Sequence, residues 1–298
     1  MLGLLTAAAI AACSPPEGTS ALLERPERVI MIGELHGTAE APRAVGEIAC
    51  AASEQGSVVV ALELEDTLQP TLDAFIAAPD DAGAVETLEG STLLNRAVQD
   101  GRTSQALLDL LMRVRALKAS GRDISLHLFQ PSSLSRGEGL DQAWYELNMG
   151  YLLSRARQTR PDARVIGLAG NIHARKTAFE DYPDLGVPAA GHLPARETLS
   201  LKIAQQGGFA WNCSQDACGV NPSMASYDAE ARGVILGVHR LRGAPGRGQS
   251  GGFPSTVGSR PGARGTGWRP GSAEAFAFGQ RQNRRWTAAD RDPNPTGP

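Results

Sequence analysis

Short, continuously apolar segments alternate with amphipathic segments along most of the chain. Residues 28–32 (RVIMI) lead to Gly33 and residues 58–62 (VVVAL) lead to Glu63, a pattern typical of strands buried on both faces of a parallel sheet. Between them, residues 41–55 carry apolar positions at helical spacing. Strand, helix and strand within about 35 residues predict a βαβ unit.

The same alternation continues further along the chain. Residues 68–119 carry two amphipathic helical faces, and residues 140–157 again have helical spacing. Strand-like segments occur at 123–129, 164–169 and 198–203. This order predicts an α/β fold with a mostly parallel sheet and helices on both faces.

The first residues have the character of an export signal. Residues 1–12 are apolar and uncharged, and small residues lead to Cys13, although the usual Lys or Arg before the apolar run is missing. Residues 10–13 resemble the lipobox of bacterial lipoproteins, which predicts a lipidated Cys13 and attachment to a membrane surface. Because Ser14 rather than Asp follows, the expected location is the cell envelope, on the periplasmic face of the outer membrane. The alternative to an export signal is a disordered, Ala-rich N-terminus of a cytosolic protein. Residues 13–24 are expected to form a tether.

The end of the chain differs in composition from the rest. Residues 243–298 are rich in Gly, Pro and Arg and have no hydrophobic period. Such a segment buries too little apolar surface to offset its ordering entropy, so we predict a disordered tail after a domain at 25–242. Two further interpretations of the tail are a basic arm for an anionic surface and an extension created by a frameshift.

Composition narrows the function classes. The chain has 298 residues, of which 29 are basic and 32 acidic, and its net charge is −3. This near-balance excludes a general polyanion binder, and no nucleic-acid partner is expected. No segment approaches the roughly 20 apolar residues of a membrane-spanning helix.

Polar residues follow three of the predicted strands. The first strand leads to Glu34 and His36, the second to Glu63, and the strand at 164–169 to Asn171 and His173. Ligands of open α/β sheets bind beyond the carboxyl ends of the strands, so we expect these side chains to converge. Two glutamates and two histidines supply ligands for a divalent metal ion, or a carboxylate and an imidazole for acid–base work on a bound water.

Other polar residues have simpler interpretations. A single histidine after a strand is usually structural, and we interpret His127 and His192 in this way, whereas His239 lies too near the tail to interpret. Glu65 and Asp66 are interpreted as solvated or capping residues.

Three motifs together resemble a known superfamily. Residues 33–38 (GELHGT), 61–63 (ALE) and 170–174 (GNIHA) are similar to the paired Gly-x-x-His motifs and strand-end Glu shared by ChaN-type haem-binding lipoproteins, Tiki metalloproteases and erythromycin esterases. The likeness covers residues 28–219. It implies an α/β sheet with an inserted helical subdomain at about 68–120. It also implies a site lined by four residues, as catalytic groups or alternatively as metal ligands: Glu34, His36, Glu63 and His173.

The chain departs from this pattern in one place. Members of this kind often have Arg-Asp at the start of the helix after the third strand, where this chain has Leu140 and Asp141. Arg102 is a candidate substitute, and we expect Arg102, Asp141 and Asn171 to contact substrate. The simpler interpretation of residues 100–104 is a helix start capped by Thr103 or Ser104.

The cysteines fall into two groups apart from Cys13. Cys213 and Cys218 are five residues apart, which predicts a local disulfide in an oxidising envelope. Cys50 lies on the apolar face of the first long helix and is expected to be a buried, unpaired thiol.

Three functions remain open from the sequence. The first is a hydrolase that uses water as nucleophile on an ester, lactone or peptide, because the chain has no Gly-x-Ser-x-Gly elbow. The second is a ChaN-like lipoprotein that binds haem or a metal ion without catalysis; Tyr145, Met149 and Tyr151 border the site, but their spacing favours core positions. The third is a non-catalytic envelope protein. The cofactor is therefore undetermined between a divalent metal, haem and none.

Overall fold

The structure is a computed structural model that describes residues 12–94, 100–132, 141–203, 208–213, 218–223 and 238–240. The predicted signal at 1–12, apart from Ala12, and the tail at 243–298 lie outside the described residues. In the described part, no helix combines the length and apolar character needed to cross a membrane.

A mostly parallel sheet forms the centre of the fold. Its order is β3-β2-β4-β1-β5-β8, and β8 alone runs antiparallel. The strands are β1 (Val29–Glu34), β2 (Val58–Glu65), β3 (Ile124–Gln130), β4 (Arg164–Gly170), β5 (Thr198–Ile203) and β8 (Val238–Arg240). The α/β class and the five parallel strands expected from the sequence are confirmed.

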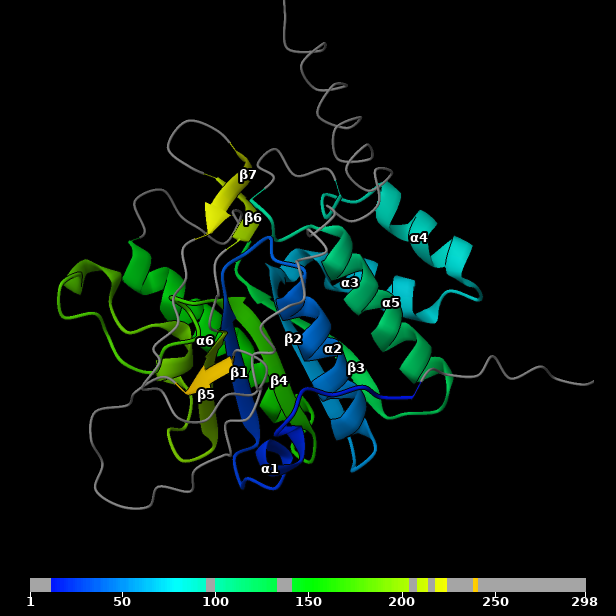
Figure 1. The fold of residues 1–298 in the computed structure, drawn as a ribbon, viewed down its shortest axis with the longest axis horizontal. Helices are drawn as coiled ribbons and strands as arrows, with labels where there is room; N and C mark the ends of the chain where they lie inside the picture. The colour runs from blue at the N-terminus through cyan, green and yellow to red at the C-terminus, as the bar shows by residue number, and fades with distance from the viewer. Residues whose placement is uncertain are drawn as a thin grey trace, which may run out of the picture. The chain divides into compact units, whose positions relative to one another are not determined.

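Helices cover both faces of this sheet (Figure 1). One face carries α1 (Thr19–Leu23), α2 (Glu40–Ser53), the 3-10 turn η1 (Asp66–Leu68), α3 (Gln69–Ala77), α4 (Asp81–Glu89) and α5 (Gln105–Ala119). The other carries α6 (Gln142–Thr159) with the 3-10 turns η3 (Pro183–Leu185) and η4 (Ala189–His192). The region expected as a helical insertion is helical, and its last helix, α5, packs along α2 in the main layer.

Alternate strand residues contact the two helical layers. In β1, Ile30 and Ile32 belong to the core on the α2 side, whereas Val29 and Met31 belong to the core on the α6 side. Side chains alternate across a strand, so a strand covered on both faces must be apolar at every position. This is why the strands appear in the sequence as unbroken apolar runs.

The segment expected to be a tether is partly built into the domain. Leu22 and Leu23 of α1 are buried in the core on the α2 side, and Thr19 Oγ1 donates a hydrogen bond to the carbonyl of Pro16. The tether prediction is wrong for this stretch, because two adjacent leucines gain more from burial than from exposure in a linker.

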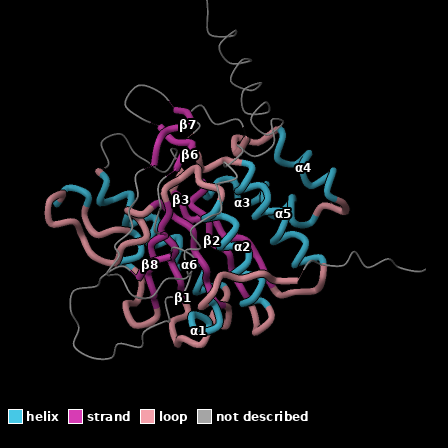
Figure 2. Tube along the Cα trace, viewed as in Figure 1, coloured by secondary structure: helices cyan, strands magenta, loops and turns pink. Residues whose placement is uncertain are grey.

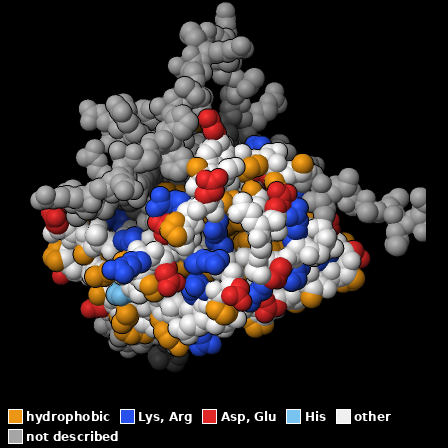
Figure 3. All heavy atoms as spheres, turned by 90° about the horizontal axis from the view of Figure 1, so that it is seen from below, with side chains coloured by type: hydrophobic (Ala, Val, Ile, Leu, Met, Phe, Trp, Pro, Cys, Tyr) orange, Lys and Arg blue, Asp and Glu red, His pale blue; other side chains and the backbone are white. Residues whose placement is uncertain are grey.

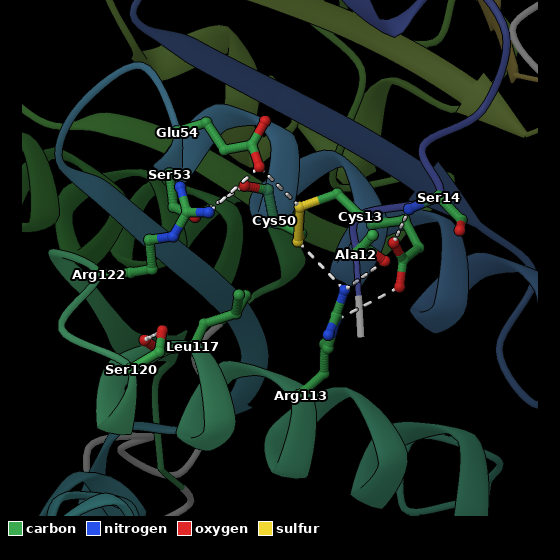
Figure 4. Close-up of a disulfide and its surroundings, with 11 residues drawn as sticks. Ala12, Cys13, Ser14, Cys50, Ser53, Glu54, Arg113, Leu117, Ser120 and Arg122 are labelled. Atoms are coloured by element: carbon green, nitrogen blue, oxygen red, sulfur yellow. Dashed lines mark hydrogen bonds and ion pairs between the residues drawn. A yellow bond between two sulfur atoms is a disulfide. The ribbon is translucent and has the colours of Figure 1, made fainter. Parts of the chain in front are cut away.

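A disulfide also ties the N-terminal segment to the domain. Cys13 is bonded to Cys50 of α2, and the guanidinium of Arg113 lies 3.1 Å from Cys50 Sγ (Figure 4). The expectation that Cys50 is unpaired is therefore wrong. A sulfur in a disulfide is not available for a thioether, so lipidation of Cys13 and this bond exclude one another.

A separate hairpin follows the main sheet. It pairs β6 (Gly208–Cys213) with β7 (Cys218–Ser223), and a disulfide joins Cys213 to Cys218, the pairing expected from their spacing. The hairpin lies apart from the six-stranded sheet at the top of Figure 2.

The end of the domain at which the parallel strands begin carries paired charges. Viewed from below, Lys and Arg side chains lie beside Asp and Glu side chains without a large region of one sign (Figure 3). Ion pairs such as Arg160–Asp123 and Arg157–Glu197 lie in segments that precede the strands. Among the described residues, this end of the sheet therefore presents both signs of charge side by side.

Candidate active site

The strand order brings the predicted site residues together. Glu34 ends β1, Glu63 lies near the end of β2, and His173 follows β4, which pairs with both of these strands. The carboxyl ends of three adjacent parallel strands therefore meet at one edge of the sheet. Of the seven residues predicted for catalysis or binding, five form one hydrogen-bonded or ion-paired cluster: Glu34, His36, Glu63, Arg102 and His173.

Glu63 is the centre of this cluster. Its Oε2 accepts a hydrogen bond from the backbone N–H of Gly170 at 2.7 Å and lies 3.6 Å from His36 Nε2. Its Oε1 lies 3.1 Å from Arg102 Nη1 and 3.6 Å from His173 Nε2. Burial alone would raise the pKa of Glu63, but the charges of the two imidazoles and the guanidinium hold this pKa far below its usual range. Glu63 is therefore a carboxylate at every physiological pH.

Each imidazole is hydrogen-bonded through Nδ1 to a different carboxylate. His36 Nδ1 lies 3.0 Å from Glu34 Oε1, and His173 Nδ1 lies 2.7 Å from Glu146 Oε1. In both pairs Nδ1 donates to the carboxylate, so that Nε2 is directed toward Glu63. The 3.6 Å separations leave each Nε2 just outside direct hydrogen-bond reach of Glu63, so neither is committed to it.

The charges of the cluster shift the pKa values of both histidines. Burial lowers the pKa of His36, but Glu63 and Glu34 outweigh it and raise this pKa to about 10, so His36 is an imidazolium at neutral pH. Burial also opposes the charged form of His173, while Glu63 and Glu146 raise its pKa and the charge of His36 lowers it. The two carboxylates outweigh the opposing effects, so the pKa of His173 is raised.

Glu34 differs from Glu63 in its surroundings. Burial raises the pKa of Glu34, and its Oε2 is buried without a hydrogen-bond partner among the described residues. One oxygen of this carboxyl group thus serves His36, while the other is turned away from polar partners.

Gly170 lets the imidazole of His36 approach the end of β4 closely. A Cβ at this position would lie 2.9 Å from His36 Nε2 and 3.5 Å from both Glu63 Oε2 and His173 Cδ2. Any side chain here would stand between the two imidazoles, which explains why this strand ends in glycine.

Glu146 is a site residue that the sequence reasoning missed. It lies on α6, is completely buried, and accepts hydrogen bonds from Gln142 Nε2 at 2.8 Å and the backbone N–H of Ala189 at 2.9 Å, in addition to His173. The available signal was a single carboxylate on the otherwise apolar helix face that carries Tyr145 and Met149. A buried charged side chain is rare without a polar partner, so a glutamate on this apolar face predicted a partner for its carboxylate.

Arg102 connects the cluster to two further elements. Its Nη1 donates to Gln130 Oε1 at 2.7 Å as well as to Glu63, and its Nε donates to Asp100 Oδ2 at 2.9 Å. Gln130 ends β3, so Arg102 spans from the loop before α5 to two strand ends. The expected helix cap is also present, because the Ser104 hydroxyl accepts from the backbone N–H of Leu107.

The structure places the other predicted site residues differently. The carboxylate of Asp141 is the N-cap of α6, accepting from the backbone N–H of Trp144 at 2.8 Å, and its side chain is exposed. Asn171 donates its backbone N–H to the carbonyl of Glu34, and its Oδ1 is buried beside Gly33. Asn171 therefore borders the cluster, whereas Asp141 has a capping role.

The remaining histidines have local partners. His127 Nε2 lies 2.8 Å from the carbonyl of Leu152, and His192 Nε2 lies 2.9 Å from the carbonyl of Val187. Both have the structural role that was expected of them. The side chain of His239 lies outside the described residues.

Among the described residues, the donor set is not arranged as a metal-ion site. Within the described ranges, no group of three or more His, Cys, Asp or Glu side chains is arranged to hold a metal ion, and the cationic Arg102 occupies one oxygen of Glu63. Met149 and Tyr145 are core residues, and the Tyr145 ring packs edge-on against His173. Tyr151, expected in the core, is instead 55% exposed because it lies on the outer side of α6.

Comparison with known proteins supports the fold. No protein-family model and no curated protein matches this sequence. A solved variant of the erythromycin esterase EreC in its open conformation matches with a TM-score of 0.50 and 13% identity, over 69% of this chain and 78% of that chain. The type III effector HopBA1 matches with a TM-score of 0.43 and 14% identity, over 72% of this chain and 96% of that chain.

At these identities the likeness is one of fold. This chain shares its α/β architecture with the erythromycin esterase structure, which agrees at the level of fold with one branch of the superfamily that the motifs resemble. Its likeness to ChaN and to lipoproteins stays a prediction.

Proposed function

We propose that this protein is a hydrolase that activates a water molecule against an ester, lactone or peptide bond. The observation that carries the proposal is the arrangement around Glu63. Two imidazole Nε2 atoms approach its two oxygens from different strand ends, and each imidazole is backed by a carboxylate on Nδ1. This arrangement supplies a proton donor and a proton acceptor on one buried centre.

The two histidines have different roles in this proposal. His173 takes a proton from water through Nε2, and Glu146 stabilises the imidazolium that forms. His36, already an imidazolium at neutral pH, donates its Nε2 proton to the leaving group or to the developing oxyanion. Arg102 donates to Oε1 of Glu63, the oxygen that also faces His173, and keeps this carboxylate in place between the two rings. No step in this reaction is routed through a metal ion.

The cellular location belongs to the proposal as well. Two disulfides, Cys13–Cys50 and Cys213–Cys218, favour an oxidising compartment and therefore the cell envelope. Membrane attachment through Cys13 requires that the first of these bonds is not formed. Intact mass measurement of the mature protein separates the two forms, because a diacylglyceryl thioether adds mass and a disulfide removes two hydrogens.

The test is a hydrolysis screen of the full chain and matched variants. The purified protein is assayed on esters, lactones and peptides, and then as His36→Asn and His173→Asn, each expected to lose roughly 100-fold or more in kcat/KM. His192→Asn is the control, since this exposed histidine is not part of the cluster and its Nε2 lies 2.9 Å from the carbonyl of Val187. Full activity in both site variants would refute the proposed site, and added metal or haemin in the same assay tests the alternative cofactors.

A further inference from the structure

The β6–β7 hairpin reaches two glycines that flank the cluster. Trp211 of β6 donates its backbone N–H to the carbonyl of Gly37 at 3.1 Å. Its own carbonyl lies so close to Gly37 and Gly101 that a Cβ would be 1.8 Å away at Gly37 and 2.1 Å away at Gly101. Three backbone segments from distant parts of the chain therefore pack without side chains between them.

Both glycines also need the conformation that glycine favours. The φ angles are 82° at Gly37 and 91° at Gly101, in the left-handed region that side chains rarely adopt. Conformation and close approach thus both require glycine at these positions. Other residues at these two positions would not allow Trp211 to approach both loops in this way.

Each glycine is adjacent in sequence to a residue of the cluster. His36 precedes Gly37, and Arg102 follows Gly101. A shift of Trp211 therefore moves the backbone that carries one imidazole and the backbone that carries the guanidinium. Both side chains lie next to Glu63. A shift of the hairpin would therefore change the distances of His36 and Arg102 to this carboxylate.

The hairpin has little packing of its own to hold it in this position. In β6 only Ala210 is buried, while Phe209 is 58% exposed, and in β7 Val220 is 44% exposed. An isolated two-stranded hairpin is marginally stable in water. Asn221 Nδ2 donates across the strands to Asn212. The bond between Cys213 and Cys218, a directly opposed pair, adds the covalent restraint on this pairing two residues beyond Trp211.

We propose that the Cys213–Cys218 disulfide is a positioning element of the active site, which makes the hydrolase dependent on oxidation. The expected loss of activity rests on the proposed function. The expected movement of the two loops rests on the contacts of Trp211. A small-molecule dithiol reduces the bond: the sulfur–sulfur bond breaks, two thiols form on the protein, and the dithiol becomes a cyclic disulfide. The hairpin is then free to separate from Gly37 and Gly101.

The experiment uses the full chain in which Cys13→Ser and Cys50→Ser leave one cysteine pair, since the sequence contains four cysteines. This variant is equilibrated in dithiothreitol redox buffers, and the reduced fraction is read by thiol alkylation and mass spectrometry. Hydrolysis is measured on the same samples, together with backbone hydrogen exchange at Trp211, whose N–H donates to Gly37, and in the two loops at 36–38 and 100–102. The matched control carries Cys213→Ser and Cys218→Ser and retains the Cys13–Cys50 bond at the far end of α2.

In the test variant, kcat is expected to fall on the order of 10- to 100-fold with the reduced fraction, because small misplacements of catalytic groups have effects of this size. Hydrogen exchange at Trp211 and in the two loops is expected to rise at least about tenfold, while the melting transition of the domain stays in place. The control variant is expected to show low activity that no redox buffer changes. Oxidised Gly101→Ala, whose Cβ displaces Trp211, is expected to show the same loss of kcat.

Two results would overturn the inference. The first is unchanged exchange at Trp211 and in both loops after complete reduction, which shows that the disulfide does not hold them. The second is loss of activity only in step with global unfolding. If no variant hydrolyses any substrate, the proposed function fails by itself, while the exchange measurement still decides whether the disulfide positions the two loops.

Discussion

Replacing Glu146 by Gln tests the asymmetry between the two histidines. The carboxylate of Glu146 accepts three hydrogen bonds, from His173 Nδ1, Gln142 Nε2 and the N–H of Ala189, at 2.7 to 2.9 Å. A glutamine has one accepting oxygen and one donating NH2 group. Whichever way the amide is oriented, at least one buried donor faces another donor. Each unsatisfied buried donor costs about 1–3 kcal/mol of stability.

The catalytic effect follows from the lost negative charge. Glu146 raises the pKa of His173 and stabilises its imidazolium, so its removal lowers this pKa and weakens His173 as a base. We expect kcat/KM to fall roughly 100- to 10,000-fold, the range in which general acid–base groups contribute. The acidic limb of the pH–rate profile is expected to move to lower pH, because His173 loses its proton more readily.

The assay is a pH series of kcat/KM for the wild type and Glu146→Gln, with urea unfolding of both proteins. Glu180→Gln is the matched control, since this carboxylate is exposed. A purely structural role for Glu146 would lower activity in proportion to the folded fraction and leave the acidic limb where it is. An acidic limb that stays in place, or wild-type activity in the folded variant, refutes the role of Glu146 behind His173.

Four further predictions concern the pH dependence, the centre of the cluster and the core. The kcat/KM profile is expected to rise as His173 loses its proton above its ordinary value near 6.5 and to fall as His36 loses its proton near pH 10; a flat profile between pH 5 and 10 contradicts these assignments. The pKa of His36 is raised on folding, so the stability that its protonation contributes is complete below about pH 6.5 and is lost as the pH rises toward 10. The urea midpoint of the wild type should therefore decrease between pH 6.5 and 10, and that of His36→Asn should decrease less. Gly170→Ala is expected to reduce kcat at least about tenfold with the fold retained, since its Cβ would meet His36 Nε2 at 2.9 Å; normal kinetics would show that the centre of the cluster is not where the reaction occurs. Leu22→Ala is expected to lower the free energy of unfolding by about 2–5 kcal/mol because Leu22 is 1% exposed. Leu147→Ala, at a residue that is 51% exposed, should change it by no more than about 0.5 kcal/mol. Equal effects would show that α1 is not part of the core.

Local sequence patterns were sufficient to predict the five parallel strands, the long helices between them and the residues Glu34, His36, Glu63 and His173 of the cluster. The apolar runs at 28–32 and 58–62 predict strands because a strand covered on both faces tolerates no polar position in its interior. The polar residues that end these runs, Glu34 and Glu63, stand out for the same reason. Parallel strands present their carboxyl ends at one edge, so the strand–helix alternation predicted that these residues lie at the same edge of the sheet.

Other features depended on contacts between distant segments. The position of β4 between β1 and β2 decides which strand ends are adjacent, and no periodicity encodes that order. Glu146 became a site residue only when α6 packed against the sheet and brought its carboxylate to His173, 27 positions away. Similarly, the burial of α1, the Cys13–Cys50 bond and the approach of Trp211 to Gly37 join segments with no common local pattern. Hydrophobic patterning is a property of neighbouring residues, whereas these contacts exist only after the core has packed, which is why the tertiary structure alone decided them.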